Sequence, residues 1–278
     1  MKHLYIIGNG FDLHHGIPSS YYNYMHWLCV NYPELYDEIS RTFINAEQKT
    51  WWSDFEHHLA EVEYMYDLSA VIYPDYEIEG IALKGKNSPE RLSAVYKAVQ
   101  MTFSVWVRGL NDFLIGVHPD LPLDVDATYL SFNYTNTLQN VYGIPDEHVL
   151  HIHGNAEKGE DIIIGHDSSG ANFQYMQSEI IDIEGLGYAI GKQISTFQKP
   201  TAKIIESNRA FFESLRDIER ITVYGFSFSS IDMPYVKEII KFTSENVVWH
   251  IYVYSIDELK RFEKLNKELL LNMEYELC

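Results

Sequence analysis

Short apolar segments recur along the chain and predict the strands of a buried sheet. Each segment is apolar or aromatic and is bounded by turn residues, as expected of a buried strand. Five segments fit this description: 4–7, 127–132, 149–153, 221–224 and 247–254.

Between these segments the spacing of apolar residues becomes that of helices. Ser53 and Glu56 have the spacing of a capping box at the start of 53–66. Ser88 is expected as the N-cap of a long helix whose first residue is Pro89. Further helices are expected at 20–30, 201–217, 232–243 and 256–270.

This alternation predicts an α/β fold with a Rossmann-like, mainly parallel sheet flanked by helices. No repeat, low-complexity tract or linker divides residues 1–278, which predicts a single domain. A helical insertion or subdomain is expected at approximately 20–125, because several helices separate the first two strands.

Composition narrows the class of protein. The 278 residues are 46% hydrophobic, which suits a packed core, and no apolar run has the length of a membrane span or a signal peptide, so the expected location is cytoplasmic. The formal net charge of −19, with no dense Lys/Arg cluster, argues against direct binding of nucleic acid or a membrane. The two cysteines, Cys29 and Cys278, are too few for a disulfide framework or a four-cysteine zinc site.

The stretch "LYIIGNGFDLHHGIPSSY" at 4–21 is the first candidate site. Gly8 and Gly10 follow a strand and precede a helix, the setting in which a glycine-rich turn brings backbone N–H groups to a pyrophosphate. A dinucleotide fingerprint would have a third glycine where Leu13 stands. The residues alone therefore leave two alternatives: a nucleotide-binding turn, or a strand-to-helix corner with Asp12 as its N-cap.

The wider spacing of this stretch resembles the sirtuin fingerprint G-A-G-[IV]-S-x-x-x-G-I-P, in its glycines and in its final Ile17-Pro18. Three later motifs resemble sirtuin motifs in the same order: "SFNYT" at 131–135, "VLHIHGN" at 149–155 and "VYGFSFSSID" at 223–232. With "IIIGHD" at 162–167, the set resembles the AbiH abortive-infection family of bacterial phage-defence proteins, which itself resembles sirtuin-like NAD-binding domains.

The resemblance implies a sirtuin-like fold with NAD as substrate or ligand. It places Gly8, Asn9, Gly10 and Asp12 at the pyrophosphate side and Thr135 in the second binding motif. Gly225 and Ser227 would hold the adenosine half of the dinucleotide. Asn133 would orient water or a ribose hydroxyl at the scissile bond, and His153 would act as the base.

Departures from the sirtuin pattern limit what the resemblance implies. Two cysteines cannot build the zinc module of two CxxC pairs, so protein deacylation is not expected. Thr135 stands in place of the nicotinamide-contacting Asp, and Ser19-Ser20-Tyr21 replaces Asp-Phe-Arg after Gly-Ile-Pro.

Two functional hypotheses follow. One is a glycohydrolase that cleaves NAD in response to infection, and the other is a nucleotide-sensing or assembly module without turnover. An effector acting on nucleic acid is disfavoured by the acidity. The expected partner is a small-molecule nucleotide, and a homo-oligomer stays open.

Other polar residues have structural readings beside the functional ones. Asn133 and Thr135 could satisfy backbone groups at a strand end, and His153 could be a structural histidine. His151 and His153 share one strand face, which permits a metal pair, but no carboxylate-rich motif accompanies them and no metal is predicted. Three residues complete the set: His166 and Asp167, which could line the same cleft, and Asp232, which is expected first as an N-cap and second as a ribose contact.

Overall fold

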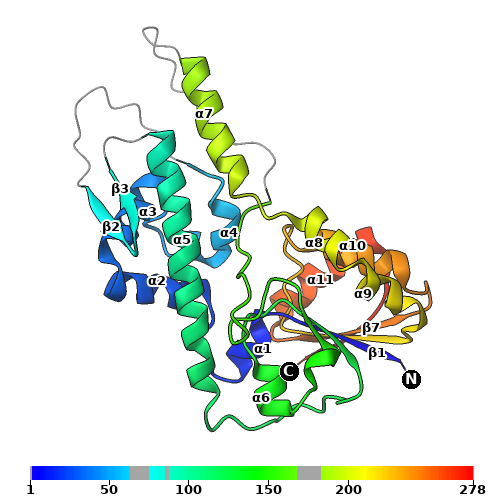
Figure 1. Ribbon diagram of the computed structural model, residues 1–278. Coiled ribbons are helices and arrows are strands. Elements are labelled where there is room, and N and C mark those ends of the chain that lie inside the picture. Colours follow the sequence, from blue (N-terminus) through cyan, green and yellow to red (C-terminus); the bar gives the residue numbers. More distant parts are fainter. Residues whose placement is uncertain (1, 63–74, 85–87, 168–182, 278) are drawn as a thin grey trace. The chain divides into compact units, whose positions relative to one another are not determined.

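The computed structural model describes residues 2–62, 75–84, 88–167 and 183–277 (Figure 1). The chain divides into two compact units. The first contains residues 1–19, 107–162 and 200–278, and the second contains 20–106 and 163–199. The predicted single domain with an insertion at about 20–125 stays a prediction.

The first unit is built on a six-stranded sheet in the order β5-β4-β1-β6-β7-β8. All five strand pairings in this sheet are parallel, which confirms the predicted α/β class. The chain adds β4 and β5 on one side of β1 and then β6 to β8 on the other, so the strand order reverses at β1. Such a reversal in a Rossmann-like sheet is where ligands bind, beyond the carboxyl ends of the strands. The strands are β1 (His3–Ile7), β4 (Thr128–Ser131), β5 (Val149–His151), β6 (Arg220–Tyr224), β7 (Val248–Val253) and β8 (Asn272–Leu277).

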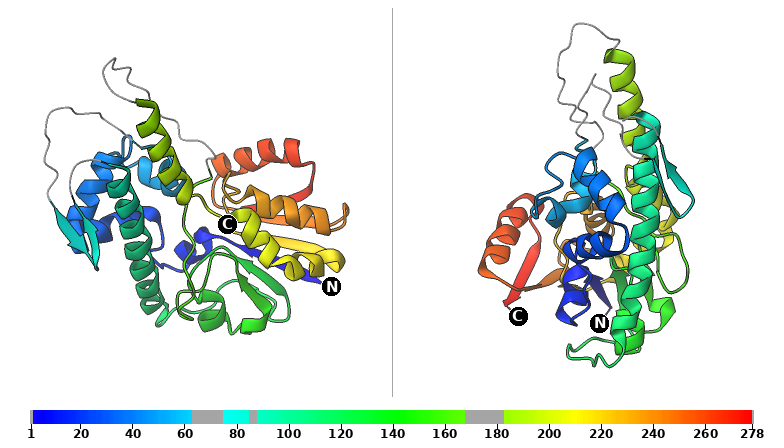
Figure 2. Two further views of the ribbon diagram at one scale, coloured as in Figure 1. Left: turned by 45° about the horizontal axis from the view of Figure 1, so that its top comes forward. Right: turned by 90° about the vertical axis from the view of Figure 1, so that its left-hand side faces the viewer.

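Helices cover both faces of this sheet (Figures 1 and 2). On one face, Phe11 of α1 and Leu138 of α6 pack against strand side chains. On the other, α11 packs on β7, and α10 packs against α8 and α9. The helices of this unit are α1 (Asn9–His14), α6 (Thr137–Tyr142), α8 (Thr201–Ser207), α9 (Arg209–Ser214), α10 (Met233–Phe242) and α11 (Ile256–Leu269), with 3₁₀ helices at Leu110–Leu114, Asp146–His148 and Leu215–Asp217.

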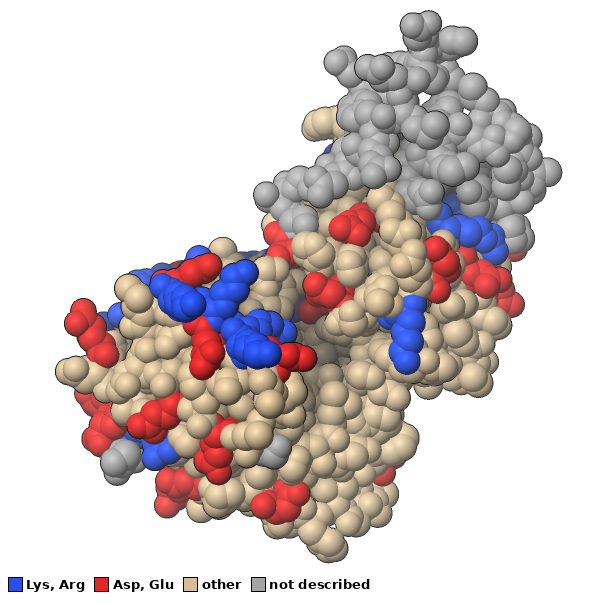
Figure 3. Space-filling view, turned by 180° about the vertical axis from the view of Figure 1, so that it is seen from behind, with Lys and Arg blue, Asp and Glu red and all other residues tan. Residues whose placement is uncertain are grey.

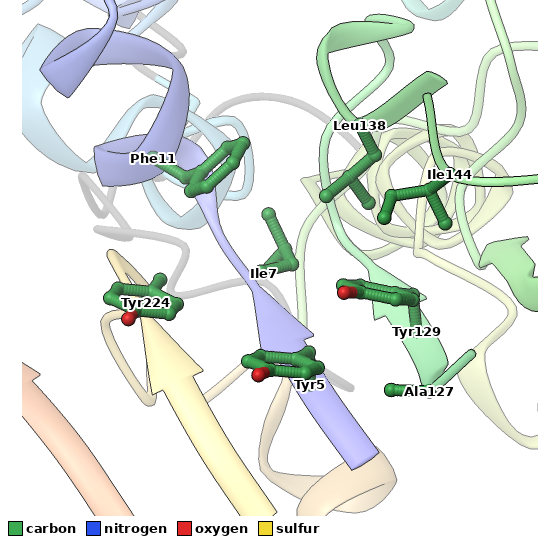
Figure 4. Packing of buried hydrophobic residues seen from close by; sticks show 8 residues of the cluster. All are labelled: Tyr5, Ile7, Phe11, Ala127, Tyr129, Leu138, Ile144 and Tyr224. Atoms are coloured by element: carbon green, nitrogen blue, oxygen red, sulfur yellow. The ribbon is translucent and has the colours of Figure 1, made fainter. Parts of the chain in front are cut away.

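Tyrosines form part of the core on the α1 and α6 face. Figure 4 shows the Tyr5 ring of β1 between those of Tyr129 on β4 and Tyr224 on β6. The Tyr5 ring stacks on Tyr129 at 4.8 Å and lies nearly parallel to Tyr224 at 6.4 Å between centroids. The three central strands are thus joined by ring packing as well as by hydrogen bonds.

The second unit contains helices around an aromatic core. Tyr24 packs edge-to-face on Phe103 at 5.2 Å, and Trp52 stacks on Phe55 at 5.1 Å. This unit also contains a buried ion pair, in which Arg91 Nε donates to Glu38 Oε1 at 2.6 Å. Its elements are α2 (Tyr21–Asn31), α3 (Pro33–Thr42), a 3₁₀ helix (Trp51–Asp54), α4 (Phe55–His58), the hairpin β2 (Tyr76–Ile78) and β3 (Ile81–Leu83), most of α5 (Pro89–Gly109) and α7 (Ile183–Thr196).

Three local predictions are wrong. Ser53 Oγ donates to Thr50 O within a 3₁₀ helix, so Ser53 and Glu56 do not form a capping box. The helix expected at 201–217 is broken at Asn208, because Asn208 leaves the helical conformation and its side chain donates back to Ile204 O. The helix expected at 53–66 is also mostly absent from the described residues, since α4 ends at His58 and 59–62 are not helical, while 63–66 lie outside the described residues. The start at Ser88 is confirmed, since its Oγ accepts from Arg91 N at 3.2 Å.

Candidate functional site

The predicted site residues of the first unit follow the carboxyl ends of four neighbouring strands. Three backbone hydrogen bonds tie the loops after these strands together. Phe132 N donates to Ile7 O at 2.8 Å, and Ile152 N donates to Ser131 O at 3.0 Å. Gly8 N donates to Tyr224 O at 2.9 Å. The ends of β1, β4, β5 and β6 therefore form one continuous edge, which we call the strand-end site.

The glycines of the first motif form a tight junction between β1 and β6. A Cβ on Gly8 would lie 2.5 Å from Gly225 O, and one on Gly225 would lie 2.3 Å from Phe11 N. Gly225 also has a positive φ of 61°, which favours glycine. Gly10 N donates to Gly225 O at 2.9 Å, so the N–H groups of both Gly8 and Gly10 are used within the protein. Backbone packing accounts for these glycines, and their predicted contact with a pyrophosphate stays a prediction.

Asp12 lies inside α1 and not at its start, where Gly8 is the N-cap, so the alternative that Asp12 is an N-cap is wrong. Its side chain is 1% exposed and accepts hydrogen bonds from Thr135 Oγ1 at 2.6 Å and Thr137 Oγ1 at 2.7 Å. The carboxylate therefore joins the first motif to the loop after β4. In this structure the two predicted binding residues, Asp12 and Thr135, contact each other.

Burial raises the pKa of the Asp12 carboxyl above its ordinary 3.8, and the neighbouring Thr135, Thr137 and Asn133 offset part of this rise. The folded protein thus holds this proton to higher pH than the unfolded chain does. We expect the stability of the wild type relative to Asp12→Asn to fall as the pH rises from below 3.8 through the raised pKa. Urea unfolding of both proteins at a series of pH values measures this difference, and a difference that grows with pH contradicts it.

Asn133 is held by its backbone at the end of β4 and has a buried side chain. Its N–H donates to Ser131 Oγ at 3.2 Å, and its carbonyl accepts from His151 Nδ1 at 2.9 Å. The residue is 6% exposed, and its Nδ2 makes no hydrogen bond with any part of the chain that the structure describes. The amide also favours the ionised form of Asp12, which places it close to that carboxyl. A buried donor without an acceptor is unfavourable unless a further group satisfies it.

His151 belongs to the same edge but is held in its neutral form. Its Nδ1 faces the Asn133 carbonyl, which only accepts, and its Nε2 lies 3.0 Å from Gln139 Nε2, which only donates. Nδ1 therefore carries the proton. Burial lowers the pKa of His151, in agreement with this assignment. Both nitrogens are engaged, so His151 has a structural role here.

His153 lies beyond the end of β5 among aromatic rings and is 3% exposed. Its ring packs edge-to-face on Phe132 at 5.5 Å. Its Nε2 lies 3.2 Å from the Tyr235 hydroxyl and 3.9 Å from Asp232 Oδ1. Because Phe132 precedes Asn133, the structure brings the two predicted catalytic residues, Asn133 and His153, to neighbouring strand ends.

The remaining predicted residues lie at the edges of the site. Asn9 is exposed, and its Oδ1 accepts from Ser19 Oγ at 2.5 Å. Ser227 is exposed between the buried rings of Phe226 and Phe228. Phe228 has a positive φ of 53°, an unfavourable conformation for an aromatic residue, which marks the loop after β6 as locally strained.

His166 and Asp167 belong to the second unit. His166 is fully buried, with Nε2 2.9 Å from Ile194 O, and Asp167 lies 3.1 Å from His57 Nδ1. Glu56 pairs with Lys199 Nζ at 2.9 Å and accepts from Gly165 N at 3.2 Å. His166 and Asp167, at the end of the "IIIGHD" motif, therefore make contacts within this unit.

Sequence analysis missed Thr137 and Tyr235. Thr137 follows Thr135 at an interval of two in "NYTNT", a repeat of hydroxyl residues that could have indicated two donors to one acceptor. Tyr235 lies three residues after Asp232, on the same face of a helix, and this spacing could have paired them.

The described residues contain no group of three or more His, Cys, Asp or Glu side chains that could hold a metal ion. Among the helices that the structure describes, none is long and apolar enough to cross a membrane. On the face shown in Figure 3, Lys and Arg lie among Asp and Glu. Among the described residues, Lys241 pairs with Glu238 at 2.8 Å and Lys260 pairs with Asp257 at 3.6 Å.

Comparison with protein families gives one match: the model described as "Bacteriophage abortive infection AbiH" matches residues 4–253. The matched range begins within β1 and ends with β7, so it includes all four strand ends of the site. No curated protein and no solved structure matches the chain.

Proposed function

This chain belongs to the AbiH family of bacteriophage abortive-infection proteins, and we propose that it binds NAD at the strand-end site and hydrolyses the bond between nicotinamide and ribose. The observation that carries the proposal is the buried Asn133 amide, whose Nδ2 makes no hydrogen bond with any described residue. This donor follows β4, which pairs with β1, the strand at which the strand order reverses, and His153 follows the neighbouring strand β5. A ribose oxygen or the attacking water would supply the acceptor that Nδ2 lacks.

The reaction demands positioning more than acid catalysis. The bond from ribose C1′ to the pyridinium nitrogen breaks, and nicotinamide leaves with the electron pair and becomes neutral. Water forms the new bond to C1′ and loses a proton, so the products are nicotinamide, ADP-ribose and one proton. Asn133 would orient the water or a ribose hydroxyl, and His153 would accept the proton before releasing it to solvent.

The glycine junction favours a second candidate function, in which the site senses a nucleotide without turnover. The N–H group of Gly8 donates to Tyr224 O at the end of β6, and that of Gly10 donates to Gly225 O, so neither is directed to a pyrophosphate. In this alternative, binding at the strand ends changes the conformation or the assembly of the protein. Asn133 and His153 are buried. In both candidate functions the nucleotide would therefore have to reach buried groups.

One experiment separates these candidates. Purified protein is incubated with NAD, and nicotinamide and ADP-ribose are quantified by chromatography, with Asn133→Ala and His153→Ala in parallel. Cleavage by the wild type and its loss in both variants is the result we expect. Undiminished cleavage in both variants contradicts the assigned roles. Calorimetric binding of NAD without cleavage supports the sensing function, and the absence of both binding and cleavage contradicts both candidates.

A further inference from the structure

Side chains hold both backbone groups of Asn133. Its N–H donates to Ser131 Oγ at 3.2 Å, and its carbonyl accepts from His151 Nδ1 at 2.9 Å and from Ser131 Oγ at 3.4 Å. The carbonyls of Ser131 and Tyr134, on either side of Asn133, accept instead from backbone N–H groups. The His151 ring therefore takes the place of a backbone donor at Asn133, and its hydrogen bond is the shorter of the two to that carbonyl.

The groups on either side of the His151 ring determine where its proton lies. Nδ1 faces the Asn133 carbonyl, which only accepts, and Nε2 lies 3.0 Å from Gln139 Nε2. Gln139 Nε2 also donates to Asp146 Oδ1 at 3.3 Å. The hydrogen bond from Lys158 lowers the pKa of Asp146, so this carboxyl is ionised at neutral pH and requires a donor from Gln139. His151 Nε2 therefore accepts, and Nδ1–H is directed to Asn133.

The hydrogen bond from His151 influences where the Asn133 amide lies without touching it. Fixing the N–H and the carbonyl of one residue fixes the two peptide planes that meet at its Cα. Only the side-chain torsions χ1 and χ2 then determine the position of Asn133 Nδ2. These torsions are restricted as well, because the side chain is buried close to the Asp12 carboxyl.

We propose that His151 is a positioning residue that holds the backbone of Asn133 so that its side-chain amide is directed to the ligand. The proposal rests on the proposed function, in which that amide orients the attacking water or a ribose hydroxyl. His151 takes no part in proton transfer, because its Nδ1–H is used by Asn133 and its Nε2 by Gln139. Without His151 the peptide plane after Asn133 rotates, and the amide moves away from the reacting group.

Two amide substitutions test this role, because they place a donor at different distances from the backbone. The Nδ2 of an asparagine occupies the place of histidine Nδ1, whereas the Nε2 of a glutamine occupies that of histidine Nε2. We therefore expect His151→Asn to keep the hydrogen bond to Asn133 and His151→Gln to lose it. Nitrogen-15 NMR follows the side-chain amide of Asn133, whose signals are assigned by their loss in Asn133→Ala. These signals should shift in His151→Gln and keep their wild-type position in His151→Asn.

His148→Gln is the matched control. His148 Nδ1 also lies close to a backbone carbonyl, that of Val125, at 2.8 Å. The substitution therefore removes a similar hydrogen bond elsewhere in the first unit, and it should leave the Asn133 amide signals unchanged.

The kinetic readout follows from the same assignment. The kcat for NAD cleavage should fall about 10- to 100-fold in His151→Gln, because misplacement of an orienting group has effects of that size. In His151→Asn and His148→Gln it should change less than about twofold, since the backbone of Asn133 stays in place. The KM should change little in all three variants, because neither histidine touches the substrate.

The proposal is overturned if the Asn133 amide signals are the same in His151→Gln as in the wild type, or if His151→Asn shifts them as far as His151→Gln does. If His151→Gln does not fold, the ring nitrogens of wild-type His151 decide. A proton on Nδ1 supports the proposal, and a proton on Nε2 alone overturns it. A wild type without NAD cleavage contradicts the proposed function instead, and the NMR results still decide the role of His151.

Discussion

Replacing Asn133 with alanine is expected to lower the rate of NAD cleavage about 100-fold while leaving the protein nearly as stable as before. The loss of rate follows if the amide positions the reacting group, because misplacement of such a group has effects of that size. The backbone hydrogen bonds of Asn133, to Ser131 and His151, do not involve its side chain. The free energy of unfolding should therefore change by less than about 1 kcal/mol, since Nδ2 has no hydrogen bond to lose.

Asn155 is a matched control for this prediction, because it is 1% exposed in the same unit and its side chain is fully engaged. Its Nδ2 donates to Asn136 Oδ1 at 2.6 Å, and its Oδ1 accepts from two backbone N–H groups. Asn155→Ala should cost about 2 kcal/mol of stability, because it leaves buried groups unpaired. Steady-state kinetics and urea unfolding of both variants give the comparison. A large loss of stability in Asn133→Ala would contradict our assignment of its side chain to the ligand.

The second large effect is expected at the junction of β1 and β6. An alanine at Gly225 would place its Cβ 2.3 Å from Phe11 N and 2.4 Å from Gly10 C, distances that require the two loops to separate. This movement would also weaken the hydrogen bond from Gly10 N to Gly225 O. We therefore expect Gly225→Ala to lower the free energy of unfolding. The positive φ should contribute about 1–2 kcal/mol to this loss, and forced repacking about 1–3 kcal/mol.

Gly159→Ala separates these two contributions. Gly159 has a similar positive φ of 68°, but no atom lies within 4 Å of the Cβ it would gain. Both variants share the backbone cost, so Gly225→Ala should be less stable than Gly159→Ala by at least about 1 kcal/mol. Urea unfolding with a common m-value measures this difference. Equal losses in the two variants would show that the junction is looser than the structure indicates.

Five strands could be predicted from the sequence because each is a compact apolar run; four of them lie in the interior of the sheet and β5 lies at its edge. The segment predicted at 221–224 corresponds to β6, and that at 247–254 corresponds to β7, with ends that differ by a residue. Strand β8 was missed because it is no apolar run: exposed residues, such as Glu274 and Glu276, alternate in it with partly buried ones. Its pairing with β7 depends on the tertiary structure and leaves little pattern in the local sequence.

The composition of the site could be predicted better than its contacts. Asn133 and His153 were identified from motifs, and the parallel sheet brings their strand ends together. A local cap was one of two alternatives for Asp12, and its actual partners, Thr135 and Thr137, could not be seen because they are 123 and 125 residues away. Asp232 was misinterpreted for the same reason: its position before α10 is visible in the sequence, but its side chain accepts no hydrogen bond from the first turn of that helix and lies 3.9 Å from His153 Nε2 instead. Local sequence patterns predict where a residue lies in a helix or strand. Contacts between residues of distant loops can be seen only once the fold is known.

The most direct test of our account is the response of individual histidine side chains to NAD, followed by nitrogen-15 NMR. His153 follows β5, at the carboxyl edge of the sheet, whereas His3 begins β1 and His148 immediately precedes β5. NAD bound at the strand-end site should shift the signals of His153 and leave those of His3 and His148 unchanged. If saturating NAD leaves the His153 signals unchanged, or shifts those of His3 and His148 instead, the nucleotide does not bind at the strand ends.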